Sequence, residues 1–293
     1  MTQKKPVAEA SGKLDLNAVW SRGTALLLEN SQLIAILAGV FVFLPTAGLQ
    51  FTLPADAQIE GPMTALLDME SSEATKEKAA QTLGELLAPF LTLSGLSLVV
   101  NHVGYAAIVA LIGRARPTVG QALAQAFRVI FPLLLALLIA ALAIYAVLIA
   151  LQVVLSPLGP AVAIFLGSIV GLLFAFFVTA RLFLTLPVMV LEWRLNPLKA
   201  LARSWRLTAQ SASNVFGFWM LMAVAWFVSL LFEIVLSTGL ASIPGPGSIA
   251  FLIDGLLGGV FAMVWGSIYC AMGVAMHAQL KGPDAGDIAA KFE

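Results

Sequence analysis

The chain has 293 residues, of which 60% are hydrophobic and 11% are charged, and its formal net charge is zero. A soluble domain typically carries about 25% charged residues, so a soluble fold could not hide this much apolar surface, and the neutral balance argues against electrostatic binding of nucleic acid. One cysteine and two histidines exclude an intrachain disulfide and a zinc or iron–sulfur ligand set, so we expect no metal and no cofactor.

Six apolar segments follow one another along the chain, each long enough to cross a hydrocarbon core of about 30 Å as a helix. Alternation of polar and apolar residues is absent over these lengths, which excludes a transmembrane barrel. The predicted fold is all-α, with transmembrane helices at 32–53, 86–112, 130–155, 160–191, 214–240 and 248–280. They form one domain over 32–280, between an amino-terminal segment 1–31 and a tail 281–293.

Positive charge lies on one side of these helices. Of the 16 lysines and arginines, 13 fall in alternate connecting segments and only two in the others. The positive-inside rule makes the basic segments, and with them both termini, cytoplasmic. The acidic loop 54–85 and the turns at 156–159 and 241–247 are then external. The basic set comprises Lys4, Lys5, Lys13, Arg22, Arg114, Arg116, Arg128, Arg194, Lys199, Arg203, Arg206, Lys281 and Lys291.

The first apolar span has a competing interpretation as a secretion signal. Ala55, Asp56 and Ala57 after it look like the small-residue site of a signal peptidase. The polar segment before the span exceeds 30 residues and the apolar stretch exceeds 20, and both are too long for a signal peptide. We therefore expect this span to be retained.

A short amphipathic segment precedes spans 1, 3 and 5. The third copy is the clearest, because Asn196 can cap a helix whose first residue is Pro197. We predict this helix over 196–212. Its apolar stripe is Leu198, Leu201, Ala202, Trp205, Ala209 and Ala212, and the opposite face carries Lys199, Arg203, Arg206 and Gln210.

In the first two copies Asp15 and Thr118 can act as caps, and the segments reach Trp20 and Phe127. Since each copy starts a pair of spans on the same side, the predicted architecture is three helical hairpins in parallel orientation. Two interpretations of the amphipathic segments stay open. They are connectors that obey the positive-inside rule, or helices that lie in the headgroup layer and contact lipid.

The run ARLFLTLPVMVLEWRLNPLKALARSWRLTAQ at 180–210 resembles the signature of the membrane domain found with some bacterial glycerophosphoryl diester phosphodiesterases and of the related YciC-like inner-membrane family. The start of the chain, LDLNAVWSRGTALLLENSQLIAI, is similar to the family's amino end. The matching signature positions are Arg181, Pro187, Glu192, Ala200, Leu201, Ser204, Trp205, Leu207 and Thr208.

The resemblance implies a multi-pass protein of the bacterial cytoplasmic (inner) membrane that is associated with phospholipids or membrane integrity. In the fused enzymes a soluble barrel domain cleaves the phosphodiester, and nothing in this chain after span 6 corresponds to it. The resemblance therefore implies a membrane module without catalysis, so we expect no enzyme activity and no catalytic residues.

Four ionisable residues lie within the predicted spans, where charge is costly and usually paired. Arg181 is either a structural arginine bonded to carbonyls or a fixed cation for a lipid phosphate or another anion. Glu233 and Asp254 lie near the external side, as wet carboxylates or as a pair that shares a proton. His102 is expected to form an interhelical hydrogen bond rather than to bind a metal.

Two functional hypotheses follow. The first is a non-enzymatic inner-membrane protein that binds phospholipid or supports membrane integrity, with lipid or anion contacts at Arg181, Lys199, Arg203, Trp205 and Arg206. The alternative is a transporter or channel for a small anion or lipid-derived solute, with Arg181 as its central cation. Membrane phospholipids are the expected partners, nucleic acid is not, and a homo-oligomer or a membrane-protein partner stays open.

Overall fold

The computed structural model describes residues 14–50, 52, 56–68, 70–114, 117–241 and 247–282. Helices make up 91% of the described residues and none of these is in a strand, which confirms the predicted all-α class. Within this part of the chain, six helices are long and apolar enough to cross a membrane: Ser31–Leu49, Glu73–Ile112, Val119–Leu158, Pro160–Leu191, Ala209–Gly239 and Leu252–Lys281. Their number and order agree with the predicted spans and are consistent with a multi-pass membrane protein.

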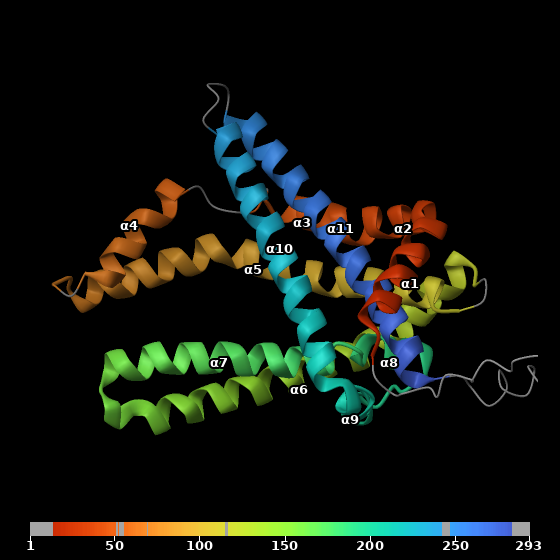
Figure 1. Ribbon diagram of the computed structural model, residues 1–293. Coiled ribbons are helices and arrows are strands. Elements are labelled where there is room, and N and C mark those ends of the chain that lie inside the picture. Colours follow the sequence, from red (N-terminus) through yellow and green to blue (C-terminus); the bar gives the residue numbers. More distant parts are fainter. Residues whose placement is uncertain are drawn as a thin grey trace, which may run out of the picture. The chain divides into compact units, whose positions relative to one another are not determined.

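The chain divides into two compact units, which are described one at a time. Unit 1 contains Met1–Ser31, Ala106–Phe227 and Ile268–Glu293, and unit 2 contains Gln32–Tyr105 and Val228–Ser267. Three long helices, α5 (Glu73–Ile112), α10 (Ala212–Ala241) and α11 (Gly247–Lys281), contribute to both units (Figure 1). The other helices fall almost wholly within one unit.

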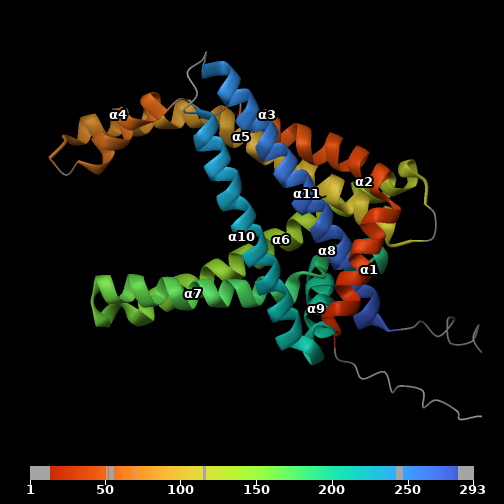
Figure 2. The ribbon, with the colours of Figure 1, turned by 45° about the horizontal axis from the view of Figure 1, so that its top comes forward.

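Unit 1 holds α1 (Leu16–Glu29), α6 (Val119–Leu155), α7 (Pro160–Leu182), α8 (Thr185–Leu191) and α9 (Pro197–Leu207). A short 3₁₀ turn, η2 (Ser156–Leu158), joins α6 to α7, which lie side by side in Figures 1 and 2. The two helices approach closely where α7 has Gly171, because a Cβ atom there would come within 2.6 Å of Leu148 Cδ2. The glycine is what allows this pairing.

The side chains expected to cap the amphipathic segments do so. Asp15 accepts hydrogen bonds from the backbone N–H groups of Asn17 (2.9 Å) and Ala18 (3.2 Å). Thr118 and Gln121 form a reciprocal capping box at the start of α6. The second amphipathic segment is not a separate helix, however, because α6 runs without interruption from Val119 into the apolar span.

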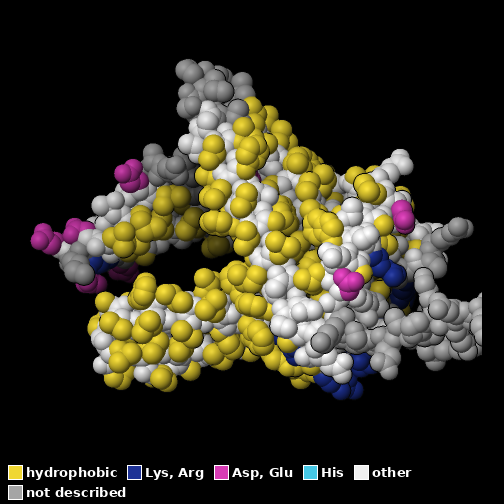
Figure 3. Space-filling model, in the orientation of Figure 1, with side chains coloured by type: hydrophobic (Ala, Val, Ile, Leu, Met, Phe, Trp, Pro, Cys, Tyr) yellow, Lys and Arg dark blue, Asp and Glu magenta, His cyan; other side chains and the backbone are white. Residues whose placement is uncertain are grey.

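The surface of α7, and of α6 beyond Arg128, is mostly apolar (Figure 3). Phe131 and Phe165 are 79% and 65% exposed, and many aliphatic side chains around them are exposed as well. A helix that is hydrophobic all round needs an apolar environment on every side. These helices therefore have the surface of segments that contact lipid.

The fourth span is broken, where the sequence predicted one helix over 160–191. Helix α7 ends at Leu182, a turn follows at Phe183 and Leu184, and α8 begins at Thr185. Pro187 has no N–H to donate to the carbonyl of Phe183, so one bond of a continuous helix is missing at this point. The break leaves backbone carbonyls, such as that of Arg181, available to side chains elsewhere in unit 1.

Unit 2 begins with most of α2 (Ser31–Ala38), followed by a π-helical turn, η1 (Gly39–Phe43), and α3 (Leu44–Gln50). The first predicted span, 32–53, thus contains a wide turn that sequence periodicity did not reveal, and its residues 51 and 53 lie outside the described part. Gly259 of α11 packs against this turn. A Cβ atom at Gly259 would lie 2.7 Å from Phe43 Cδ2 and 3.0 Å from Phe43 O.

The acidic segment predicted as an external loop over 54–85 is largely helical. It contains α4 (Asp56–Leu67) and the first turns of α5, which starts at Glu73. The sequence of the second part is rich in Ala, Glu, Lys and Leu, which are strong helix formers. Ser72 also accepts a hydrogen bond from the Thr75 N–H at 3.2 Å and so caps α5.

Candidate functional site

Helix α9 begins as the sequence predicts. Asn196 Oδ1 accepts a hydrogen bond of 3.0 Å from the N–H of Lys199, and Pro197 is the first helical residue. The proline has no N–H to leave unsatisfied in the first turn, and its fixed φ suits a helix start. The cap thereby fixes the register of every side chain along α9.

The end of α9 differs from the prediction of a helix over 196–212. The helix stops at Leu207 and is followed by a 3₁₀ turn, η3 (Ala209–Ser211). The Thr208 hydroxyl donates back to the carbonyls of Ser204 (3.0 Å) and Trp205 (3.1 Å). Arg181 also bonds to the Trp205 and Thr208 carbonyls, so these acceptors are occupied where the helix would continue.

Three faces of α9 have different surroundings. Ala200 and Ser204 are fully buried, at 0% exposure, so this small-residue face is the one that packs within unit 1. The predicted apolar stripe is only partly covered, since Leu198 is 62% exposed and Trp205 is 40% exposed, although the Trp205 ring also contacts Phe177 and Arg181. Packing of α9 within unit 1 therefore leaves much of Leu198 and part of Trp205 at the surface.

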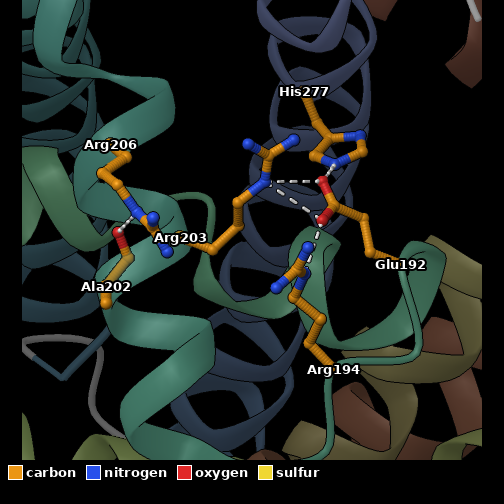
Figure 4. A network of polar contacts seen from close by, with 6 residues as sticks. All are labelled: Glu192, Arg194, Ala202, Arg203, Arg206 and His277. Atoms are coloured by element: carbon orange, nitrogen blue, oxygen red, sulfur yellow. Dashed lines mark hydrogen bonds and ion pairs between the residues drawn. The ribbon is translucent and has the colours of Figure 1, made fainter.

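The basic face of α9 lies beside this apolar stripe and not opposite it as predicted, because successive residues of an α-helix, such as Leu198 and Lys199, are only about 100° apart. Lys199 and Arg206 are exposed, and Lys and Arg side chains gather at the surface near α9 in Figure 3. Arg206 Nε makes a hydrogen bond of 3.3 Å to the Ala202 carbonyl of its own helix (Figure 4). Arg203 differs from these two, because it turns toward Glu192.

Arg181 is buried, at 4% exposure, near the end of α7. Its Nη1 donates to the Thr208 carbonyl at 2.8 Å and its Nη2 to the Trp205 carbonyl at 2.7 Å, and its guanidinium lies over the Trp205 ring at 4.6 Å. The carbonyl of Arg181 in turn accepts from the Ser204 hydroxyl at 2.9 Å. Of the two predicted roles, these contacts are those of a structural arginine bonded to carbonyls. A cation at a helix C-terminus is favourable.

Glu192 follows α8 and is surrounded by three basic side chains (Figure 4). Its carboxylate accepts from Arg194 Nε at 2.9 Å, from Arg203 Nε at 3.1 Å and lies 3.0 Å from His277 Nε2. His277 is on α11, so the carboxylate joins α8, α9 and the last helix within unit 1. This cluster, Glu192 with Arg194, Arg203 and His277, holds α9 against its neighbours.

The environment of Glu192 has opposing effects on its acidity. Burial raises the pKa of the Glu192 carboxyl. Hydrogen bonds from Arg203, His277 and Arg194 and the charge of Arg203 lower the pKa by more, so it lies below its ordinary value. The carboxylate is therefore charged near neutral pH and keeps its partners. Arg203, predicted as a lipid contact, is engaged in this internal ion pair.

His277 is the member of the cluster that sequence reasoning did not single out. It lies in the last apolar span, one helical turn before Lys281. Two features of the sequence pointed toward this contact. His277 lies near the basic end of the last span, and the signature has an acidic residue, Glu192, at the matching end of span 4. Neither feature alone specifies that the two side chains pair, because the pairing depends on the packing of α11 beside α8.

The polar residues of unit 2 are arranged differently from the prediction. His102 Nδ1 lies 2.7 Å from the Leu98 carbonyl of its own helix rather than bonding to another helix. The interhelical contact comes from the neighbouring residue, since Asn101 Nδ2 lies 3.5 Å from the Thr46 hydroxyl of α3. The His102 and Tyr105 rings pack in a T-shaped arrangement, with centroids 5.6 Å apart.

Glu233 and Asp254 lie on the two helices α10 and α11, within unit 2. Asp254 accepts a hydrogen bond from the Ser237 hydroxyl, one helical turn beyond Glu233 on α10. The structure thus gives Asp254 a hydroxyl partner. Among the described residues, no group of three or more His, Cys, Asp or Glu side chains could hold a metal ion.

The sites predicted from sequence therefore fall in two places. Arg181, Lys199, Arg203, Trp205 and Arg206 all belong to the α7–α9 region of unit 1, whereas His102, Glu233 and Asp254 lie in unit 2. Comparison with family models, with curated proteins and with solved structures finds no match to this chain.

Proposed function

We propose that this is a non-enzymatic, multi-pass protein of the bacterial inner membrane that binds phospholipid through α9, with both termini in the cytoplasm. The supporting observation is the three-faced arrangement of α9. Its small face packs within unit 1, and its apolar stripe and its two basic side chains Lys199 and Arg206 are left at the surface.

This arrangement suits a helix that lies in the headgroup layer. Leu198 and Trp205 would enter the boundary with the acyl chains, while Lys199 and Arg206 remain among the phosphates. Each cation near an anionic membrane surface contributes about 1 kcal/mol. Trp is favoured at this depth because its ring is apolar and its N–H is polar.

The roles of the arginines differ within this proposal. Arg206 and Lys199 contact lipid, whereas Arg203 holds the Glu192 cluster and Arg181 caps the end of α9. The two internal arginines keep α9 in place, so that its apolar stripe faces outward. The signature residues of the resemblance to the glycerophosphoryl diester phosphodiesterase membrane domain include several of these contacts, namely Arg181, Glu192, Ser204 and Thr208.

Solute transport is the rival function, and no contact of Arg181 favours it. Both terminal nitrogens of Arg181 already donate to backbone carbonyls, and its ring partner is Trp205. A binding cation for a moving anion needs donors that are free to exchange partners. Flux of a small anion in proteoliposomes that is lost in Arg181→Lys, with the fold intact, would revive the transport hypothesis.

The proposed function is tested by native mass spectrometry of the full chain extracted in membrane patches. In Lys199→Gln/Arg206→Gln, we expect retention of anionic phospholipid to fall by about thirtyfold, because two interfacial cations that each contribute about 1 kcal/mol are lost. The matched control is Lys76→Gln/Lys78→Gln, which removes the same charge from the acidic segment. Equal anionic lipid in both double variants would refute the proposal.

A further inference from the structure

A pocket of about 510 Å³ lies beside the start of α6, within unit 1. Four of its lining residues lie on a single face of α6, and the others come from outside this helix. The lining residues are Gln121, Ala124, Gln125 and Arg128 of α6, with Arg114, Pro117 and Trp193. The residues on α6 follow the i, i+3, i+4, i+7 spacing, so their side chains share one side of the helix. The volume is within the range of small-ligand sites.

Two guanidinium groups line this pocket, and no carboxylate is among its described lining residues. Arg128 is exposed and has no hydrogen-bond or ion-pair partner among the described residues. Arg114 makes one hydrogen bond, from Nη2 to the Val190 carbonyl at 3.3 Å, and lies over the Trp193 ring at 5.2 Å. Most of their ten N–H donors are therefore available to a ligand.

The rest of the lining is held in a fixed arrangement. Gln125 Nε2 donates to the same Val190 carbonyl, and Gln121 is fixed by its capping box with Thr118. Trp193 has φ of 55°, a left-handed conformation that is costly for an aromatic residue. This backbone conformation places its ring on the wall of the pocket, where Arg114 stacks on it.

We propose that this pocket binds a phosphate group, with Arg128 and Arg114 as its ligands. Guanidinium forks match the oxygens of a phosphate and can donate two bonds at once. No described lining residue is a carboxylate that could compensate this positive charge, and an anion with several acceptor oxygens satisfies both groups. The phosphate belongs to the headgroup of an anionic phospholipid or to a soluble phosphate ester.

The lipid version of the inference rests on the proposed function and adds a specific headgroup site to the interfacial helix. The two sites use different residues, since Lys199 and Arg206 do not line the pocket. Interfacial binding by α9 is expected to depend on the density of negative charge at the membrane surface. Binding in the pocket is expected to saturate at one phosphate per chain.

The test uses the full chain in phosphatidylcholine nanodiscs. Phosphatidylglycerol is titrated in and the first bound molecule is followed by native mass spectrometry, and in a second arm glycerol 3-phosphate is titrated calorimetrically. We expect Arg128→Gln to weaken the saturable binding about tenfold, as for the loss of one charged hydrogen-bonding partner. Arg114→Gln should act in the same direction. Arg22→Gln, which removes an exposed arginine from α1, is the matched control and should leave the affinity unchanged.

The outcomes distinguish a lipid headgroup from a soluble ester in the pocket, and the pocket site from interfacial binding by α9. Loss of phosphatidylglycerol binding in Arg128→Gln, with no response to glycerol 3-phosphate, supports the lipid headgroup, whereas the same loss in the glycerol 3-phosphate arm supports a soluble ester. Unchanged affinity in both arginine variants overturns the pocket site. If anionic lipid is still lost in Lys199→Gln/Arg206→Gln, the proposed function stands without the pocket. If no variant changes binding, both proposals fail.

Discussion

The two units differ in how they use buried polar side chains. In unit 1, Arg181 and Ser204 bond to backbone groups that are opened by the break at Phe183 and Leu184 and by the end of α9. In unit 2, the close contact is instead made by glycine, where Gly259 meets Phe43, as Gly171 also does between α6 and α7 of unit 1. The comparison indicates that the buried charge of Arg181 serves a helix end, while close approach between helices depends on glycine in both units.

The largest effect is expected from Arg181→Met. The variant leaves the Trp205 and Thr208 carbonyls without their donors and removes the contact with the Trp205 ring. Two charge-assisted hydrogen bonds and a cation–π contact together amount to about 4 kcal/mol of unfolding free energy. Thermal or SDS-induced unfolding of the purified protein measures it. A melting temperature equal to that of the exposed control Arg22→Met would contradict the assigned role.

Gly259→Val tests the packing of unit 2. The added side chain would meet the ring and the backbone oxygen of Phe43, and the latter cannot move without shifting the π-helical turn. Overpacking of this kind costs about 2 kcal/mol. Gly39 provides a matched control, since a Cβ there has no atom within 4 Å, and Gly39→Ala should change the melting temperature much less. Because both substitutions improve helix propensity, similar losses in the two variants would show that close approach at Gly259 is not the cause of the effect.

Glu192→Gln breaks the cluster that joins α8, α9 and α11. The amide keeps the shape but loses the charge that Arg194, Arg203 and His277 share. Arg194 and Arg203 are partly exposed, with side-chain exposures of 43% and 29%, so solvent screens their pairing and we expect a loss of about 1.5 kcal/mol. The melting temperature of Glu192→Gln against wild type at pH 7 measures this. An unchanged value would mean that the cluster is not stabilising.

The same cluster predicts a pH dependence. The folded-state pKa of Glu192 lies below its ordinary value, so its contribution is fully present above the unfolded pKa of about 4.3 and is lost as the pH falls through the folded value. The groups that face it are Arg194, Arg203 and His277, with Lys281 near the histidine. The difference in melting temperature between wild type and Glu192→Gln should therefore shrink below about pH 4. A constant difference down to pH 3 would contradict this.

The number and order of the spans could be predicted because each depends only on a local apolar run. The caps at Asp15, Thr118 and Asn196 were also predictable, since a cap involves residues two or three positions apart. The helical nature of 73–85 was available from composition and was missed because acidity alone suggested a loop.

The features that sequence could not supply depend on contacts between distant segments. Arg181 meets carbonyls 24 and 27 residues later, and Glu192 meets His277 85 residues later. Pro187 lies within the predicted span 160–191, where a proline interrupts helix hydrogen bonding, but neither the break nor its position was predicted. Leu198 and Trp205 of the predicted stripe are exposed, yet only the burial of Ala200 and Ser204 shows which face of α9 packs.

The most direct test of lipid binding by α9 measures the depth of this helix in a bilayer by spin labelling. In a Cys270→Ala background, which removes the buried cysteine, labels at Leu198→Cys and Lys199→Cys are compared for access to oxygen and to a water-soluble nickel chelate. If α9 lies in the headgroup layer, the label at position 198 is more accessible to oxygen and the label at position 199 is more accessible to the nickel chelate. Equal and high access of both positions to nickel would place the apolar stripe in water and contradict lipid binding by α9.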